Sequence, residues 1–321
     1  MDGGDEVTEP VLQADGLVKR FGEATAVDRL SLAVAEGEVF GLVGPDGAGK
    51  TTTLRMLCGL TLPDAGTVRL LGLPMPESRR KARARMGYMP QQYSLYGDLS
   101  VQENLRFFAG MYGVPKATLI EREKRLLGIA RLDRFRDRPA RALSGGMYKK
   151  LALACALAHS PRLLLLDEPT NGVDPISRRE LWAFLYELVG EGVSVLVSTP
   201  YMDEAERCGR VGLLLDGRLV AVDRPAALKA GFAETVFELD TAPLYERSIL
   251  IESHPDVRDV YLVGRKAHVV TARGQEFASD LSALFATAGY EIRRLDVVAP
   301  SFEDVFLRLT ASGGGAPGGE A

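Results

Sequence analysis

Short apolar runs alternate with helical patterns along most of the first 230 residues. Three of these runs have strand length and few polar positions, as in strands buried on both faces of a sheet: 38–43, 162–166 and 193–198. Apolar residues recur at helical spacing over three longer stretches: 51–60, 144–159 and 178–189. Strands that alternate with helices predict an α/β core with a mostly parallel sheet and helices on its faces.

Two kinds of segment depart from this alternation. Residues 10–37 and 62–72 have the pattern of short strands joined by turns, with Pro63, Asp64 and Gly66 as turn formers. They predict an antiparallel β subdomain. Residues from about 94 to 140 show helical spacing with many charges, which predicts a helical insertion within the core.

A second unit is expected to begin near Phe232. The stretches 236–241, 247–272 and 290–298 have strand-like patterns, and a helix is expected near 275–288, so the unit is predicted to be a small α+β domain. The Gly-, Ala- and Pro-rich end of the chain is typical of disorder. The expected organisation is a flexible tail at 1–9, a first domain at 10–230, a small domain at 231–310 and a disordered tail at 311–321.

Composition limits the classes of function. The chain has 321 residues, of which 46% are hydrophobic and 26% charged, as is ordinary for a globular protein. Its net charge of −4 argues against nucleic acid as a partner, because general nucleic-acid binders carry a basic excess. No apolar run reaches the ~18 residues that span a bilayer, and the acidic start lacks the apolar core of a signal peptide. If the protein works at a membrane, another chain is expected to supply the spans.

Two further features have ordinary structural explanations. Cys58, Cys155 and Cys208 are widely spaced and form no metal-binding pattern, which favours a reduced cytosolic protein with buried thiols. The basic run RRKARAR (79–85) is better explained as a solvated surface than as a contact with lipid or nucleic acid.

A glycine-rich segment, GPDGAGKTT (44–52), follows the first buried strand and precedes a helix. It matches the pattern G-x-x-x-x-G-K-S/T, in which backbone N–H groups and a helix N-terminus surround phosphate oxygens. Lys50 is expected to reach the β- and γ-phosphates of a nucleotide, and Thr51 to bind Mg²⁺. The expected nucleotide-binding residues are Gly44, Pro45, Asp46, Gly47, Ala48, Gly49, Lys50, Thr51 and Thr52.

Two carboxylates end the second buried strand, in RLLLLDEPTNGVDP (162–175). Asp167 is expected to hold Mg²⁺, and Glu168 to polarise the attacking water as a general base. A solvated acidic turn is the ordinary alternative, but the phosphate loop earlier in the chain favours catalysis. Asp174, beside Pro175, fits either a plain turn or a loop that crosses to a partner subunit.

The segment LSGGM (143–147) places a serine and two glycines at the start of a long apolar helix. A hydroxyl, bare backbone amides and a helix N-terminus form a second cradle for an anion. In isolation this pattern would pass as a helix cap, but its position about 20 residues before LLLLDE strengthens the functional interpretation.

In combination these motifs resemble the ATP-binding subunits of ABC transporters, over about residues 10–228. The resemblance rests on Phe21, GPDGAGKTT, YMPQQ (88–92), LSGGM, LLLLDEP and GVDP. It implies ATP and Mg²⁺ as cofactors, with Phe21 stacked on adenine. It implies that Gln91 senses Mg²⁺ and the attacking water while relaying to membrane subunits. It also implies a head-to-tail dimer in which Ser144, Gly145 and Gly146 contact the ATP held by the other subunit.

The C-terminal part, which ends in APSFEDVFLRLT (299–310), is similar to the small domain of bacterial drug-export ATPases, which work with ABC-2 type membrane permeases. By this resemblance the chain is expected to drive export of an unidentified, drug-like substrate. It would lie in the cytoplasm, on the inner face of the cell membrane, and bind there through its permease subunits. Two alternatives stay open: a soluble ABC-type ATPase not coupled to transport, and a non-hydrolysing ATP-binding partner in a heterodimer.

Three positions depart from the family's usual pattern. Asp46 replaces an asparagine, Met147 replaces a glutamine, and Pro200, in STPYMDEAE (198–206), replaces the histidine that contacts the γ-phosphate. Proline offers neither a side-chain donor nor a backbone N–H. Asp46 and Pro200 together resemble the first ATPase half of tandem bacterial multidrug-exporter subunits.

The loss of the histidine predicts two unequal ATP sites. The site built on Lys50 and Glu168 would bind ATP and turn it over slowly. The site that combines Ser144, Gly145 and Gly146 with a partner's phosphate loop and histidine would hydrolyse ATP fast. The alternative is a homodimer in which Glu168 suffices, with reduced but adequate turnover.

Overall fold

A computed structural model of the protein describes residues 9–92 and 95–313. The chain divides into two compact units, Met1–Pro225 and Ala226–Ala321, and each is described here by itself. Nearly all of the expected tail at 1–9, and most of the expected tail at 311–321, lie outside the described residues. None of the helices in the described part is both long enough and apolar enough to cross a membrane.

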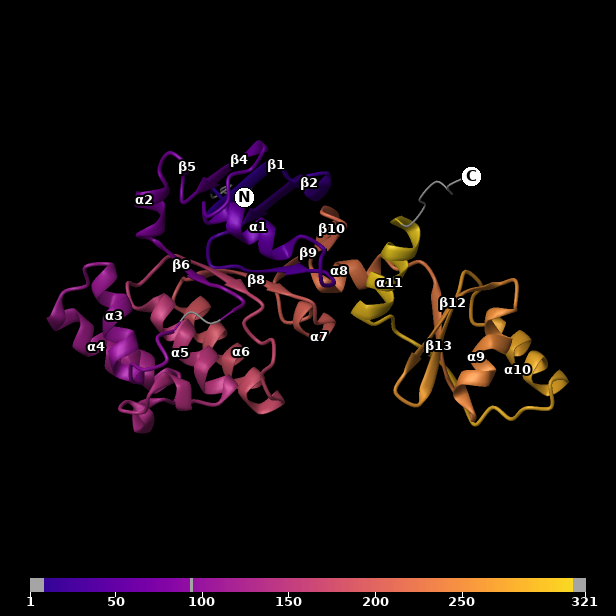
Figure 1. The fold of residues 1–321 in the computed structure, drawn as a ribbon. Helices are drawn as coiled ribbons and strands as arrows, with labels where there is room; N and C mark the ends of the chain where they lie inside the picture. Colours follow the sequence, from indigo (N-terminus) through magenta and orange to yellow (C-terminus); the bar gives the residue numbers. More distant parts are fainter. Residues whose placement is uncertain (1–8, 93–94, 314–321) are drawn as a thin grey trace, which may run out of the picture. The chain divides into compact units, whose positions relative to one another are not determined.

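The centre of the first unit is a six-stranded sheet in the order β10-β9-β3-β8-β7-β6 (Figure 1). Its strands are β3 (Val39–Val43), β6 (Met86–Met89), β7 (Leu163–Asp167), β8 (Ser194–Thr199), β9 (Arg210–Leu215) and β10 (Arg218–Asp223). Five of them run parallel, and β10 pairs antiparallel with β9. Every residue of β3, β7 and β8 is buried, as their apolar sequences predict.

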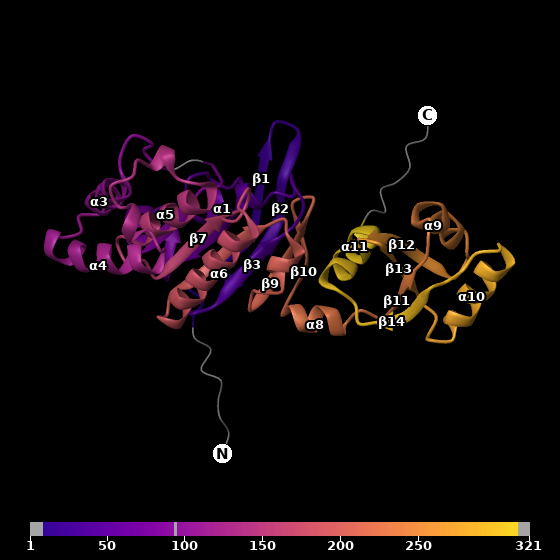
Figure 2. The same ribbon diagram turned by 90° about the horizontal axis from the view of Figure 1, so that it is seen from below.

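Helices cover both faces of this sheet (Figures 1 and 2). They are α1 (Lys50–Leu57), α5 (Gly145–Leu157), α6 (Pro175–Gly190) and the short α7 (Met202–Ala205). Helix α1 ends three residues before the predicted end, because Gly59 adopts a left-handed backbone with φ of +67°. Helix α6 begins three residues earlier than predicted, because the Asp174 carboxylate caps it and Pro175 occupies its first position.

An antiparallel sheet, β2-β1-β4-β5, forms the predicted β subdomain. Its strands are β1 (Leu12–Phe21), β2 (Ala24–Val34), β4 (Ala65–Leu70) and β5 (Leu73–Met75). Leu12 of β1 and Leu54 of α1 belong to one buried cluster with Leu165 of β7, so this sheet and α1 share a core with the central sheet. Burial of this apolar surface holds the phosphate loop between the two sheets.

The predicted helical insertion is present between β6 and α5. It consists of α3 (Val101–Met111), α4 (Lys116–Ile129) and two 3₁₀ turns, η1 (Asp133–Phe135) and η2 (Ala140–Ala142). Ser100 starts α3 with a capping box, in which Ser100 and Glu103 each accept from the other's backbone N–H at 3.2 and 2.8 Å. A further short helix, α2 (Arg79–Arg83), precedes β6.

The second unit is an antiparallel sheet, β12-β13-β11-β14, with helices on it. Its elements are α8 (Pro225–Ala230), β11 (Thr235–Asp240), α9 (Leu244–Glu252), β12 (Val257–Val263), β13 (Lys266–Thr271), α10 (Phe277–Thr287), β14 (Arg294–Val298) and α11 (Phe302–Gly313). The strand-like pattern expected from residue 247 is wrong over 247–252, which belongs to α9. Ile251 of that helix packs in the core with Phe237 and Phe277, so tertiary burial decides the conformation of a short apolar run.

A buried polar contact lies on the other face of this sheet. Ala267 and Val269 of β13 point into the core beside α9 and α10, so His268 between them points to the opposite face. There its Nδ1 lies 3.2 Å from Asp304 Oδ1 on α11. Phe302 and Val305 of α11 are buried as well, which fixes the helix to the second unit.

Lowering the pH from 7.5 to 5.5 is expected to destabilise this unit. Burial lowers the pKa of His268 below its ordinary 6.5, because the charged ring would lose hydration. The unfolded chain then binds a proton that the folded unit does not, so stability present above pH 6.5 is lost as the pH falls below it. Hydrogen exchange of β13, corrected for intrinsic rates, should quicken at pH 5.5 in the wild type and less in His268→Gln. An equal response in both would assign the effect to another group.

Candidate nucleotide-binding site

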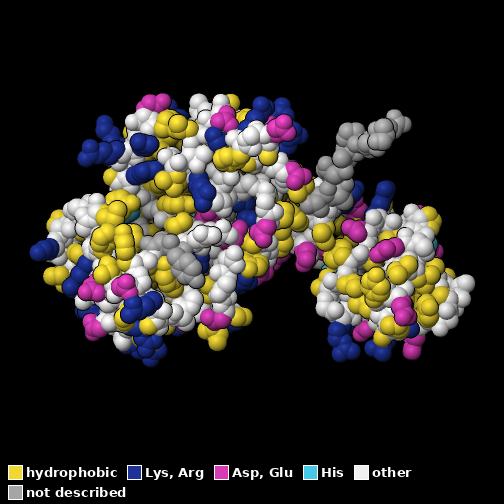
Figure 3. Space-filling model, in the orientation of Figure 1, with side chains coloured by type: hydrophobic (Ala, Val, Ile, Leu, Met, Phe, Trp, Pro, Cys, Tyr) yellow, Lys and Arg dark blue, Asp and Glu magenta, His cyan; other side chains and the backbone are white. Residues whose placement is uncertain are grey.

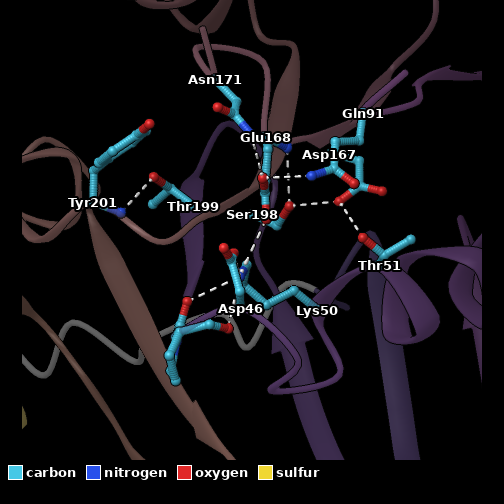
Figure 4. Close-up of polar contacts among 12 residues, drawn as sticks. Asp46, Lys50, Thr51, Gln91, Asp167, Glu168, Asn171, Ser198, Thr199 and Tyr201 are labelled. Atoms are coloured by element: carbon cyan, nitrogen blue, oxygen red, sulfur yellow. Dashed lines mark hydrogen bonds and ion pairs between the residues drawn. The ribbon is translucent and has the colours of Figure 1, made fainter. Parts of the chain in front are cut away.

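The carboxyl ends of β3, β7 and β8 meet at one edge of the central sheet (Figure 4). Val43 pairs with Thr199, and Asp167 pairs with Ser198, so the segments that follow these strands are neighbours. These segments are the glycine-rich loop, the two carboxylates and the turn at Pro200. In open parallel sheets this edge is where ligands bind.

The glycines of the loop are required by its geometry. A Cβ atom on Gly44 would overlap the carbonyl oxygen of Leu214, and one on Gly49 would overlap that of Ala26. Gly47 and Gly49 have φ of +82° and +101°, where other residues are strained. Pro45, Asp46 and Gly47 are exposed at the tip of the loop, while Ala48 is buried and Thr52 half-buried.

Lys50 is buried beneath the loop. Its ammonium donates hydrogen bonds to the carbonyl oxygens of Gly44 and Pro45, each at 2.9 Å. It also lies 3.2 Å from Glu168 Oε1 and 3.9 Å from Asp46 Oδ1. The Asp46 side chain is 91% exposed, so it places a negative charge in solvent at the mouth of the site. The usual asparagine at this position carries no such charge.

Thr51 and Asp167 form the candidate metal site. The Thr51 hydroxyl donates to Asp167 Oδ1 at 3.0 Å, and the Ser198 hydroxyl donates to the same oxygen at 2.8 Å. Burial raises the pKa of Asp167 above its ordinary value, and its Oδ2 is buried without a partner among the described residues. A hydroxyl and a carboxylate with a spare oxygen fit Mg²⁺, which binds few protein ligands and completes its shell with water and phosphate.

Three donors orient the Glu168 carboxylate. They are the Lys50 ammonium, the Gln91 side-chain amide at 2.8 Å and the Asn171 side-chain amide at 3.1 Å. The backbone of Glu168 is left-handed, with φ of +46°, and its N–H donates to Ser198 at 3.0 Å. A strained backbone held by surrounding contacts is typical of a functional position.

Gln91 connects the carboxylate to helix α5. Its side-chain amide binds Glu168 rather than Asp167 or Thr51, while its backbone carbonyl accepts from the Lys149 ammonium at 2.9 Å. Burial lowers the pKa of Lys149, although the two carboxylates nearby act against this. The expected role of Gln91 as a metal ligand therefore stays a prediction, and its contact with the expected general base is direct.

The residues expected to serve a partner's ATP lie elsewhere on the chain. Ser144 caps α5 by accepting from the Met147 N–H at 3.4 Å. Asp174 caps α6, and a Cβ on Gly146 would overlap the Ser177 hydroxyl on α6. Gly145 is exposed. Within the described residues, no hydrogen bond joins the turn at 144–146 to the phosphate loop.

The aromatic residue expected under the adenine is available to a ligand. Phe21 ends β1, its side chain is 56% exposed, and the Lys19 ammonium lies 5.6 Å from its ring centre. An exposed ring of this kind can stack on a base without rearrangement of the core.

Pro200 comes directly after the end of β8 that contacts the phosphate loop. It follows Thr199 directly, and the Thr199 carbonyl accepts from the Gly44 N–H at 3.3 Å. No histidine substitutes for it. His159 stacks on Tyr112 with ring centres 3.7 Å apart and contacts the Met86 carbonyl, and the other two histidines belong to the second unit.

Sequence patterns did not reveal three residues of this network. Ser198 touches Asp167 and Glu168, Asn171 touches Glu168, and Lys149 touches Gln91. Ser198 and Asn171 carried a faint signal, because each is a polar residue beside a buried strand end. Lys149 carried none, since a lysine on a helix is usually exposed.

The three thiols have the buried environment that the sequence predicts. Cys58, Cys155 and Cys208 are all free and buried. Burial raises the pKa of Cys58 to about 11 and that of Cys208 to about 12. These thiols are therefore unreactive and take no part in the site.

Comparison with known proteins identifies the family. The sequence model of the ABC transporter family matches residues 27–171. The Nod factor export ATP-binding protein I of Ralstonia nicotianae is 41% identical over 313 residues, which cover 94% of this chain and 94% of that protein. This chain belongs to the ATP-binding subunits of ABC transporters.

This ABC ATP-binding subunit is also similar to a second curated protein and to a solved structure. The probable multidrug ABC transporter ATP-binding protein YbhF of Escherichia coli is 47% identical over 222 residues, which are 69% of this chain but only 38% of YbhF. The chain thus spans well under half the length of that relative. The dimeric post-hydrolysis structure of the cassette MJ0796, bound to ADP and Pi, matches with a TM-score of 0.61 and 26% identity, over 66% of this chain and 98% of that one. By enzymatic class the chain is an ABC transporter ATPase, and its fold is that of the ABC ATPases with an added C-terminal antiparallel sheet.

Proposed function

We propose that this subunit binds ATP and Mg²⁺ and drives export through separate membrane subunits of the ABC-2 type. The observation that carries the proposal is the cluster of Lys50, Thr51, Asp167 and Glu168 beneath one glycine-rich loop. The names of two relatives support the direction of transport, since one is a Nod factor export protein and the other a probable multidrug transporter protein. The transported substrate itself is not encoded in this site.

Each residue of the cluster has a distinct task in this proposal. The loop N–H groups and the Lys50 ammonium bind the phosphates, and Phe21 stacks on the adenine. Thr51 and Asp167 hold Mg²⁺, which neutralises the charge that develops on the phosphates. Glu168 accepts a proton from the attacking water, and its three donors keep its carboxylate in place.

The site is proposed to be completed by a second ATPase subunit. Ser144 and Gly145 are exposed at the start of α5, where Gly146 is buried against α6, and within the described residues none of the three makes a hydrogen bond to this chain's own phosphate loop. A hydroxyl and free N–H groups at a helix N-terminus suit the γ-phosphate of ATP bound to another subunit. The dimeric state of a related cassette supports this arrangement.

The site on Lys50 and Glu168 is proposed to be degenerate. Pro200, which follows the Thr199 carbonyl that accepts from Gly44, has no donor for the γ-phosphate, and Asp46 adds a negative charge near the Lys50 ammonium. Slow turnover follows here, and fast turnover is assigned to the site that uses Ser144–Gly146 with a partner's phosphate loop. A heterodimer is favoured because the chain keeps the Ser144–Gly146 segment but lacks the histidine at position 200.

A subunit that never hydrolyses ATP is the second candidate, and Pro200 is the observation in its favour. The environment of Glu168 argues against it. Three donors and a strained backbone serve no purpose around a carboxylate that is never used as a base.

The membrane-bound role can be tested by reconstitution. The permease subunits are proposed to hold this subunit on the inner face of the cell membrane. The chain, tagged and expressed in its own cells, should co-purify with an integral membrane protein, and ATPase activity should rise when both are placed in vesicles. Activity that is unchanged by every co-purified membrane chain would favour a soluble ATPase.

Replacing Lys50 with alanine is expected to weaken ATP binding by about 10- to 100-fold, because hydrogen bonds to a charged group contribute roughly 1.5–3 kcal/mol. Titration with a fluorescent ATP analogue measures the dissociation constant. Lys124→Ala, which removes an exposed lysine from α4, is the matched control and should bind like the wild type. Equal affinity of all three proteins would place the phosphates elsewhere.

A further inference from the structure

A cluster of basic side chains lies outside the nucleotide site. Arg79, Arg80, Lys81 and Arg85 are exposed on and just after α2, and Arg83 is half-buried with its guanidinium on the Gly59 carbonyl at 3.1 Å. None of the four exposed residues forms an ion pair within the described part of the chain. This surface, which we name the α2 basic cluster, is a local feature of a chain whose net charge is −4.

Exposed apolar side chains lie next to the cluster. An open hollow of about 530 Å³ is lined by Arg79, Arg80, Arg83, Ala84, Met111 and Tyr112. Met111, at the end of α3, is 67% exposed, and Tyr112 is 43% exposed. Figure 3 shows Lys and Arg side chains gathered over α2, with hydrophobic side chains beside them toward α3.

We propose that the α2 basic cluster and Met111 form a docking surface for anionic phospholipid in a bilayer. Lysines and arginines are drawn to a negative membrane surface, and neighbouring apolar side chains enter the headgroup region. Lipid headgroups can move to meet exposed cations that have no fixed partner, which a rigid acidic protein surface cannot do. The proposal does not depend on ATP or on a permease.

The contribution of each charge sets the size of the effect. A basic residue near an anionic membrane contributes about 1 kcal/mol, which is roughly a fivefold change in partition coefficient. Removing three such charges should therefore weaken binding by about 100-fold at low ionic strength. Added salt should weaken the wild type in the same way, because screening shortens the range of the attraction.

Co-sedimentation of the purified chain with vesicles tests the proposal. Vesicles of phosphatidylcholine with 30% phosphatidylglycerol, about the order of an anionic leaflet, should bind the wild type, whereas pure phosphatidylcholine should not. The variant R79Q/R80Q/K81Q should bind the anionic vesicles about 100-fold more weakly than the wild type. The control K124Q/R258Q/R265Q removes three exposed charges elsewhere and should bind within about threefold of the wild type. Met111→Ser should weaken binding about fivefold and leave the salt dependence intact.

Two outcomes would overturn the proposal. One is equal vesicle binding by the cluster variant and its control. The other is unchanged vesicle binding by R79Q/R80Q/K81Q together with loss of a co-purified membrane chain, which would make the cluster a protein interface. Circular dichroism and ATP binding, both expected to be unchanged, separate these outcomes from misfolding.

Discussion

Pro200→His is expected to raise the steady-state ATPase rate of the purified chain by about 10²–10³-fold, the effect typical of one hydrogen-bond donor aimed at developing charge. Position 200 directly follows Thr199, the last residue of β8, whose carbonyl accepts from the Gly44 N–H of the phosphate loop. The other residues proposed to act here are already paired at this edge, Lys50 with Glu168 and Thr51 with Asp167. Restoring one imidazole donor should therefore restore turnover without any other change.

Pro200→Ala is the control for this substitution. It removes the proline ring and restores a backbone N–H but supplies no side-chain donor. If alanine accelerates hydrolysis as much as histidine, the proline limits the rate through backbone geometry. If neither variant accelerates it, the missing histidine is not the cause of slow turnover.

In the assembled transporter, Gly146→Val is expected to reduce transport strongly and Glu168→Gln only slightly. The valine side chain would overlap Ser177 on α6 and displace the turn that we propose contacts the partner's ATP. ATP-driven transport should then fall by at least about 10²-fold, the effect typical of losing one donor to developing charge. If this chain's own site is the slow one, as we propose, Glu168→Gln disables only that site and most of the transport should remain.

The pair of variants distinguishes unequal sites from equal ones. Complete loss of transport in Glu168→Gln would mean that this chain's own site carries out the fast reaction, as in a homodimer. Normal transport in Gly146→Val would show that the Ser144–Gly146 segment has no role in ATP hydrolysis. Thermal unfolding of both variants, compared with the wild type, shows whether either effect arises from misfolding.

The sequence predicts the α/β core well, since the central part of each buried strand is apolar. β3, β7 and β8 are buried on both faces, and the few polar residues of β7 and β8 lie at their ends. Helix boundaries were less accurate because single residues set them: Gly59 beyond the end of α1, and Asp174 at the start of α6. The secondary structure of the small second unit is harder to predict, because the run at 247–252 is too short for its period to distinguish a helix from a strand.

In the candidate site, too, local sequence patterns predict some residues, and tertiary packing alone brings in the others. Lys50 and Asp167 could be predicted, because one ends a recognisable phosphate loop and the other ends an apolar strand. The contacts of Ser198, Asn171 and Lys149 depend on how separate elements pack, and no local pattern encodes that. Only the structure therefore reveals that Gln91 contacts both Lys149, through its carbonyl, and Glu168, through its side chain.

The measurement that tests the account most directly compares bound ATP with released phosphate in the purified wild-type chain. We expect close to one ATP retained per chain with Mg²⁺, and turnover at least 100-fold below the roughly 10 s⁻¹ that is typical of enzymes. Tight binding with slow release of phosphate would agree with a site that holds ATP but lacks its histidine. Sustained turnover near 10 s⁻¹ by this chain alone would contradict the degenerate site.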